Sequence, residues 1–336
     1  MQLREVGGAE PQRPALVTHE LAGNQASVEC VAFSADGKLV ASGGEDRSVC
    51  VWEVSTGQPQ RRFEGFPGEV QQVAFLPDRS SVVAWADKGT IYLLDVETGS
   101  RRDLIAEYAE DDDLSDTGLE AGPLPIVFGV SPVAPLPAVA DSLAFETHLK
   151  LWDLDGGTSV ETLPPTTSVK QLTCSPNGRQ LAICGHGVVV VWDVARGQLR
   201  HRCEFDEEAY LEEDCVAWSS DGRTIAVLDA KAGTIRRWDA RTGEVSEALK
   251  TDVDLMSGIY FPPNNRVLAV RDGPGVRLLD ARTCEFLLRL AHRNEFIRRV
   301  AFSPDGQAMA TAGTARMSCC GTSRDTAACR FARPAR

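Results

Sequence analysis

Carboxylates form the densest groups of potentially reactive side chains in this chain. Two segments hold them, residues 107–120 (EYAEDDDLSDTGLE) and residues 204–214 (EFDEEAYLEED). Clustered carboxylates can ligate Ca²⁺, but a calcium loop spaces its ligands regularly around a turn glycine, and neither segment has that spacing. We therefore predict no metal site and no cofactor.

The same carboxylates suit a negative surface that repels nucleic acid and attracts basic protein partners. The alternative is that both segments are solvated loops that only aid solubility. The candidate partner-binding residues are Glu110, Asp111, Asp112, Asp113, Asp116, Glu207, Glu208, Glu212, Glu213 and Asp214.

No pattern typical of an enzyme accompanies these acids. The chain lacks a nucleophile elbow, a zinc-protease helix motif and a phosphate-binding glycine loop, and its five histidines occur singly. Its ten cysteines include no Cys-x-x-Cys pair, and several lie within apolar segments, as buried reduced thiols do. We predict no catalytic residue.

A recurring strand determines how these segments are positioned. It ends in Trp-Asp or a close substitute and returns about every forty residues, the period of an architecture built from one repeated supersecondary unit. The repeat positions are Trp52, Leu94, Asp95, Trp152, Asp153, Trp192, Asp193, Trp238, Asp239, Leu279 and Asp280.

Each unit contains further strands ahead of the Trp-Asp strand. An apolar strand such as residues 28–34 (VECVAFS) is followed by an Asp-Gly or Asn-Gly turn, then by a strand of small and apolar residues. The turn dipeptides favour a tight hairpin in which both central residues have positive φ. A turn aspartate, such as Asp46 or Asp272, then precedes the Trp-Asp strand.

These motifs resemble the WD-repeat β-propeller family, in the divergent, YVTN-like form of its bacterial members. The resemblance implies an all-β fold, a seven-bladed β-propeller of four-stranded antiparallel sheets, with the last blade incomplete. The family's Gly-His dipeptide is nearly absent, and Gly23-Asn24 stands at one of its positions. We therefore expect the buried hydrogen-bond relay from His through Ser and Asp to Trp to be mostly missing.

The repeat divides the chain into three regions. Residues 1–27 are predicted to form an N-terminal arm, in which residues 15–21 close the ring by completing the last blade. Residues 28–316 form the propeller. Residues 317–336 form an aberrant, disordered tail, because the seventh Trp-Asp is due near Cys320 and the segment RMSCCGTSRDTAA stands there instead. A shifted reading frame from Met317 can encode Val-Val-Leu-Trp-Asp-Val at that place, so we interpret the tail as frameshifted.

Composition agrees with one closed domain. The hydrophobic content of 43% can supply a core, and the net charge is −13. No apolar run reaches membrane-spanning length, and the first residues lack the apolar stretch of a signal peptide. We expect a cytoplasmic, monomeric protein that binds neither membrane nor nucleic acid.

The resemblance implies a non-catalytic scaffold that binds proteins through the loops at the propeller rim, here through an acidic face. One alternative is a sensory or regulatory propeller module from a larger protein fused to a kinase or protease. Another is a propeller enzyme or small-ligand binder.

Overall fold

A computed structural model gives the structure of the chain. It describes residues 19–21, 23–78, 80–86, 90–105, 127–130, 137–143, 146–153, 158–166, 169–185, 187–205, 214–246, 248–251, 258–273, 275–291, 296–306, 308–313 and 326–330. No helix among these residues is long and apolar enough to cross a membrane.

All described strands pair antiparallel in four-stranded sheets. Five sheets are described with their side chains, and each consists of four consecutive strands. They are β2 (Val28–Phe33), β3 (Leu39–Gly44), β4 (Val49–Glu53) and β5 (Pro59–Phe63); β6 (Val70–Phe75), β7 (Ser81–Ala86), β8 (Ile91–Asp95) and β9 (Arg101–Ile105); β14 (Gln171–Cys174), β15 (Gln180–Gly185), β16 (Val188–Asp193) and β17 (Gln198–Glu204); β18 (Val216–Trp218), β19 (Thr224–Asp229), β20 (Thr234–Asp239) and β21 (Leu249–Lys250); β22 (Gly258–Tyr260), β23 (Val267–Asp272), β24 (Gly275–Asp280) and β25 (Phe286–Ala291).

Two more sheets are described wholly or partly by backbone pairing. One contains β10 (Val127–Val130), β11 (Pro137–Leu143), β12 (Glu146–Asp153) and β13 (Thr158–Thr166). The other has the order β1 (His19–Glu20), β28 (Thr326–Arg330), β27 (Ala308–Gly313) and β26 (Ile297–Phe302). The fold is therefore all-β and built from four-stranded antiparallel sheets, as predicted.

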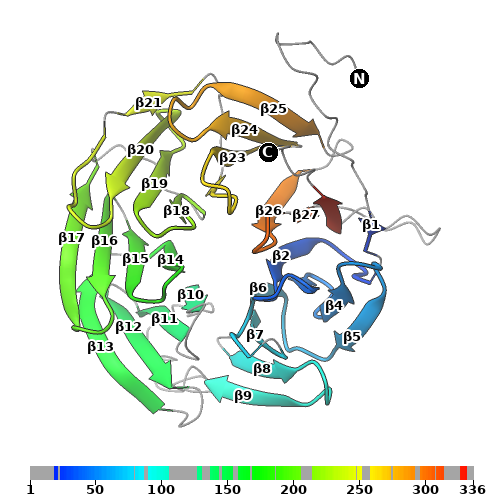
Figure 1. Ribbon diagram of the computed structural model, residues 1–336. Coiled ribbons are helices and arrows are strands. Elements are labelled where there is room, and N and C mark those ends of the chain that lie inside the picture. The colour runs from blue at the N-terminus through cyan, green and yellow to red at the C-terminus, as the bar shows by residue number, and fades with distance from the viewer. Residues whose placement is uncertain are drawn as a thin grey trace, which may run out of the picture.

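The sheets stand around a central axis as the blades of a β-propeller. Figure 1 shows β2, β6, β10, β14, β18 and β26 nearest the centre, and β5, β9, β13, β17, β21 and β25 along the circumference. The apolar core lies between neighbouring sheets. For example, Val49 and Val51 of one sheet pack with Val70, Val82 and Leu94 of the next. A single small sheet cannot bury both of its faces, but in the ring each sheet packs between two neighbouring sheets.

The turn between the first two strands of a blade recurs four times with the same contacts. Ser34 accepts the backbone N–H of Leu39 and donates its hydroxyl to the carboxylate of Asp36 at 2.8 Å. Only the glycine of the dipeptide has positive φ, as at Gly37 (+70°). The expected hairpin with two positive-φ residues is therefore wrong. The serine closes a longer loop by holding the aspartate side chain, so that residue needs no left-handed backbone. Ser175, Ser219 and Ser303 make equivalent contacts.

The last blade is where the structure departs from the sequence prediction. Its four strands are all present, so the expectation of an incomplete blade is wrong for the strand pairing. β28, with the sequence TAACR, takes the place of the missing Trp-Asp strand between β27 and β1. Backbone N–H and C=O groups at a sheet edge can pair with any extended segment, whatever its side chains. A search for the Trp-Asp pattern could not find this strand.

The N-terminal strand pairs across this seam. β1 falls within the predicted closure segment 15–21, and His19 lies opposite Ala328 of β28. Leu21 is buried and packs with Trp52 and Ala310. The region boundaries and the frameshift remain predictions, because residues 1–18, 314–325 and 331–336 lie outside the described residues. The predicted disorder of residues 317–336 is wrong for Thr326–Arg330, which form β28.

Candidate functional site

The first strands of the blades place polar side chains at one end of the central channel. Equivalent repeat positions hold Glu29, Gln71, Lys170, Asp214 and Arg298, each at or just before the start of a first strand. Equivalent positions on strands that run in the same direction around a ring lie at the same end of it. We call this end of the channel, defined by these five residues, the channel mouth.

Asp214 is the most constrained residue of the channel mouth. The Tyr260 hydroxyl donates to its Oδ2 at 2.6 Å, and Nη1 of Arg299 lies 2.5 Å from the same oxygen. Asp214 has a φ of +61°, an uncommon backbone conformation for a residue with a side chain. The three side chains come from three consecutive blades, so their meeting point lies on the channel wall.

Burial and neighbouring charges decide the pKa values of Asp214 and Tyr260. Burial by itself would raise the pKa of Asp214, but the positive charges of Arg299 and Arg271 and the hydrogen bonds from Arg299 and Tyr260 outweigh it and lower that pKa. Burial and the Asp214 charge raise the pKa of Tyr260. At neutral pH the pair is therefore a carboxylate and a neutral phenol. Neither group is poised to exchange a proton near pH 7.

A second ion pair lies where the last blade meets the first. Nη1 of Arg298 lies 2.7 Å from Oε2 of Glu29, and half of the Arg298 side chain is exposed. The other oxygen of Glu29, Oε1, is buried and has no hydrogen-bond partner within the described part of the chain. Burial, opposed by Arg298 and reinforced by Glu45 and Glu69, raises the pKa of Glu29.

A cavity of about 320 Å³ opens between the first strands of four blades, from β14 to β26. Asp214 and Tyr260 line it together with Gln171 and apolar residues such as Phe302. The Gln171 amide is already hydrogen-bonded to the backbone of Val216: it donates to Val216 O at 3.0 Å and accepts from Val216 N at 2.8 Å. The cavity thus has a mixed polar and apolar lining, and Asp214 is the charged residue in it.

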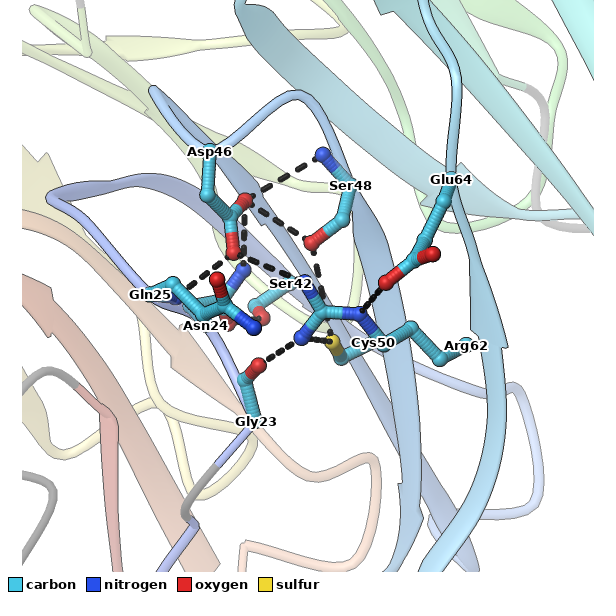
Figure 2. A network of polar contacts seen from close by, with 9 residues as sticks. All are labelled: Gly23, Asn24, Gln25, Ser42, Asp46, Ser48, Cys50, Arg62 and Glu64. Atoms are coloured by element: carbon cyan, nitrogen blue, oxygen red, sulfur yellow. Dashed lines mark hydrogen bonds and ion pairs between the residues drawn. The ribbon is translucent and has the colours of Figure 1, made fainter. Parts of the chain in front are cut away.

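Near the N-terminus, a polar network ties the first blade together (Figure 2). Ser42 donates to Asn24 Oδ1 at 2.6 Å, and Asn24 Nδ2 donates to Asp46 Oδ1 at 3.4 Å. Asp46 also accepts the Ser48 hydroxyl at 2.8 Å and forms an ion pair with Arg62. The relay that we expected to be missing is therefore kept in part in this blade, between Ser42, Asn24 and Asp46. An asparagine amide can both accept and donate, as a histidine ring does, so Asn24 fills the histidine position.

The relay stops short of the tryptophan. Nε1 of Trp52 is buried without a hydrogen-bond partner among the described residues, so the indole N–H donates to neither Ser42 nor Asp46. A Cβ added at Gly23 would lie only 2.7 Å from Cζ2 of Trp52. Glycine is therefore required at position 23 because the indole ring packs against the backbone there.

The predicted repeat residues divide into two structural roles. Trp52, Leu94, Trp192, Trp238 and Leu279 are buried in the core between the blades. The aspartates that follow accept backbone N–H groups of the next turn; they are Asp95, Asp193, Asp239 and Asp280. Hydrogen bonds from these turns lower the pKa of Asp95, Asp239 and Asp280. Trp152 and Asp153 lie in β12, and their side chains are outside the described part of the structure.

Only one of the predicted partner-binding residues can be placed. Asp214 lines the cavity between the first strands and is held by Tyr260 and Arg299. The other nine residues lie within 106–126 and 206–213, outside the described residues, so their role stays a prediction. No group of three or more potential metal ligands occurs among the described residues.

Sequence reasoning missed several exposed or converging side chains. Tyr260 and Arg299 were not singled out, although Tyr260 stands where Ala32 and Ala74 occupy the same repeat position. Phe296 was also missed, and 66% of its surface is exposed next to the channel mouth. Aligning the repeats position by position would have identified Tyr260 as a residue that breaks the pattern.

A second missed feature lies on the circumference. The residue that pairs with the core Trp or Leu is an exposed apolar side chain in three consecutive blades. These residues are Leu199, Val245 and Phe286. The signal was available in the sequence, since all three follow the Trp-Asp motif by a similar number of residues.

Comparison with known proteins supports the repeat assignment. The model of the WD domain, G-beta repeat, matches residues 16–53, 157–193 and 284–320. Protein tipD of Dictyostelium discoideum is 22% identical over 315 residues, which are 92% of this chain and 42% of that protein. Eukaryotic translation initiation factor 3 subunit I of Botryotinia fuckeliana is 23% identical over 323 residues, which are 87% of this chain and 90% of that protein.

A further relative matches a shorter segment. The U3 small nucleolar RNA-associated protein 15 homolog of Gallus gallus is 26% identical over 168 residues, covering half of this chain and 29% of that protein. The chain therefore spans less than half the length of several of these relatives, including tipD.

Proposed function

Because this chain belongs to the WD-repeat family, we propose that it is a non-catalytic scaffold that binds partner proteins at the channel mouth and the adjoining rim loops. We further infer a ring of seven blades, one for each four-stranded sheet. The fold supports binding without chemistry, since propeller blades are held by their repeats while the loops vary.

One observation carries the choice of surface. Arg298 and Phe296 are both exposed at the channel mouth, on either side of the buried Ile297, and Arg298 is held in position by Glu29 at 2.7 Å. Arginine and aromatic side chains supply much of the binding energy at protein interfaces. A pre-positioned arginine also loses less conformational entropy on binding than a free one.

Charge suggests the class of partner. The two acidic segments follow the fourth strand of one blade and precede the first strand of the next along the chain, and we propose that both lie at the rim on the side of the channel mouth. We propose that they attract proteins with basic surfaces and disfavour nucleic acid. Such attraction acts mainly on the association rate and weakens with salt.

A second candidate function is a regulatory module of a larger protein. The observation in its favour is coverage, because the chain spans only 42% of tipD and 29% of the U3-associated relative. Sequencing the gene on both sides of this segment decides it. A continuous reading frame into a kinase or protease domain supports the module, and an isolated frame supports the scaffold.

The scaffold proposal is tested by affinity capture with the purified chain, followed by quantitative mass spectrometry at low and high salt. Two variants are compared with the wild type. In one, the nine acidic candidates other than Asp214 are changed to Gln or Asn. The other is Arg298→Glu. Arg282→Glu is the matched control, because Arg282 follows the end of β24 and lies at the opposite end of the blade.

We expect Arg298→Glu to abolish capture of specific partners and the neutralised variant to reduce it at low salt. Arg282→Glu should capture normally. Equal capture by all four proteins at both salt concentrations would contradict the proposal.

A further inference from the structure

Two buried thiols from neighbouring blades meet in this structure. Sγ of Cys184, in β15, lies 3.0 Å from Sγ of Cys215, the residue immediately before β18. Both side chains are buried, and both belong to the core cluster between these two blades. Non-bonded sulfur atoms normally stay farther apart than this, and a disulfide needs them only about 1 Å closer.

The pair is the one place among the described cysteines where two thiols touch. Cys30 instead directs its thiol at the carbonyl oxygens of Gly43 and Val70, and Cys50 contacts Ser48. Cys203 belongs to the same core cluster as the pair, but no thiol contact is recorded for it. Among the described cysteines, the geometry therefore favours a disulfide between Cys184 and Cys215 alone.

We propose that Cys184 and Cys215 form a reversible disulfide, a peroxide-sensitive modification site that links two neighbouring blades. One thiol attacks a peroxide oxygen, which gives a sulfenic acid and releases water. The second thiol then attacks the sulfenic sulfur, a sulfur–sulfur bond forms and a second water leaves. Overall, hydrogen peroxide is reduced by two electrons and the two thiols are oxidised to one disulfide.

Burial sets the rate of this reaction and its selectivity. The contact with Cys184 and burial raise the pKa of Cys215, so little thiolate is present at neutral pH. Reaction requires a small oxidant that penetrates the core during local opening, and large disulfides such as oxidised glutathione are excluded. The same burial slows reduction of the bond, which a small thiol reaches through the same local opening.

The disulfide would restrain the residues at the channel mouth. Cys215 follows Asp214, whose backbone has a φ of +61° and whose carboxylate holds Tyr260 and Arg299. Cross-linking Cys215 to β15 also restrains the last residue of the acidic segment 204–214. Oxidation would thus fix the geometry of one wall of the channel mouth.

The test treats the purified full chain with hydrogen peroxide and digests it with trypsin without reduction. Cleavage after arginine gives peptide 180–196, which contains Cys184, and peptide 203–223, which contains Cys203 and Cys215. The expected product is the two peptides joined, with a mass lower than their sum by about 2 Da, the two hydrogens lost on oxidation. Oxidised glutathione at the same oxidising equivalents should give no joined product.

Variants identify the sulfur atoms. Cys184→Ser and Cys215→Ser should abolish the joined product, whereas Cys203→Ser, matched in burial and in the same tryptic peptide, should retain it. Loss of the product in Cys203→Ser, a joined species only between separate chains, or oxidation to sulfinic acid without a joined product would overturn the proposal.

Thermal unfolding gives an independent readout. A bond that fits the native geometry closes a loop between positions 31 apart and restricts the unfolded chain. The Tm of oxidised wild type should rise by roughly 5 °C relative to reduced protein, and neither single variant should show the rise. An unchanged or lower Tm in a sample with the joined peptides would overturn the claim that the native fold accommodates the bond.

Discussion

Arg237 of β20 donates from Nη1 to the carbonyl oxygen of Ala281 in the next blade, at 2.6 Å. Arg61 makes the corresponding contact four blades earlier, from Nε to Val96 O at 3.0 Å. Val96 and Ala281 both directly follow the aspartate of a Trp-Asp strand or its substitute. The same acceptor position therefore fastens neighbouring blades at this corner in both places, although Arg61 lies on the fourth strand of its blade and Arg237 on the third.

Replacing Arg237 should loosen that corner. Arg237→Met keeps most of the aliphatic stem but removes a charge-assisted hydrogen bond to a carbonyl, which should lower the free energy of unfolding by about 1.5 to 3 kcal/mol. Urea unfolding followed by tryptophan fluorescence measures the change. Arg282→Met, at an exposed turn, is the matched control and should change stability by less than about 0.5 kcal/mol. Equal effects of the two substitutions would argue against the corner contact.

The Asn24 network predicts a specific order of stabilities. Asn24→Ala leaves Ser42 and Asp46 without their shared partner and should cost about 1 to 3 kcal/mol. Asn24→His should cost less, because the imidazole can accept from one group and donate to the other. Gly23→Ala should be worse than either, since its Cβ would lie 2.7 Å from the Trp52 ring. Chemical denaturation of the three variants establishes the order, and a more stable Asn24→Ala than Asn24→His would refute it.

Asp214 should stabilise the fold above its unfolded pKa and lose that effect in acid. Its folded pKa is lowered, so its contribution is complete above about pH 5 and is lost as pH falls below about 4. Asp214→Asn should be less stable than wild type by about 2 to 3 kcal/mol at pH 7, with the difference shrinking below pH 4. Unfolding curves between pH 3 and pH 7 measure this. A pH-independent difference would show that the carboxylate charge is not what matters.

Glu29 should have the opposite effect. Its folded pKa is raised, chiefly by burial, so ionisation opposes folding and stability falls as pH rises through the interval above the unfolded value of about 4.3. Glu29→Gln should therefore match wild type near pH 4 and exceed it at pH 7. The same denaturation series checks the sign, and a less stable Glu29→Gln at pH 7 would mean that its ion pair with Arg298 outweighs burial.

The gene itself tests the interpretation of the tail. If residues from Met317 onward are read in a shifted frame, the codons from Met317 to Ser323 should encode Val-Val-Leu-Trp-Asp-Val in that frame. Restoring the frame should then place a buried tryptophan in the last blade and raise the free energy of unfolding, since burying such a side chain contributes about 3 to 5 kcal/mol. DNA sequence that excludes Trp or Asp in the shifted frame ends this interpretation.

Much of the fold could be predicted because the same strand pattern occurs in several repeat units. Trp52, Trp192 and Trp238 recur at one position, and all three are buried between blades. The loop between the first two strands was mistaken, because the Ser34 side chain supplies contacts that the dipeptide Asp36-Gly37 does not reveal.

The sequence by itself determined a ring of small antiparallel sheets. One such sheet cannot bury both of its apolar faces, so the repeated sheets must pack against one another. The tertiary structure alone decided which side chains meet inside that ring. Asp214, Tyr260 and Arg299 are far apart in the chain and share no motif, yet the ring brings three first strands to one channel wall. It likewise brings Cys184 to Cys215 and lets β28 fill an edge without its Trp-Asp pattern. Such contacts depend on distances across the ring, and no local pattern encodes those distances.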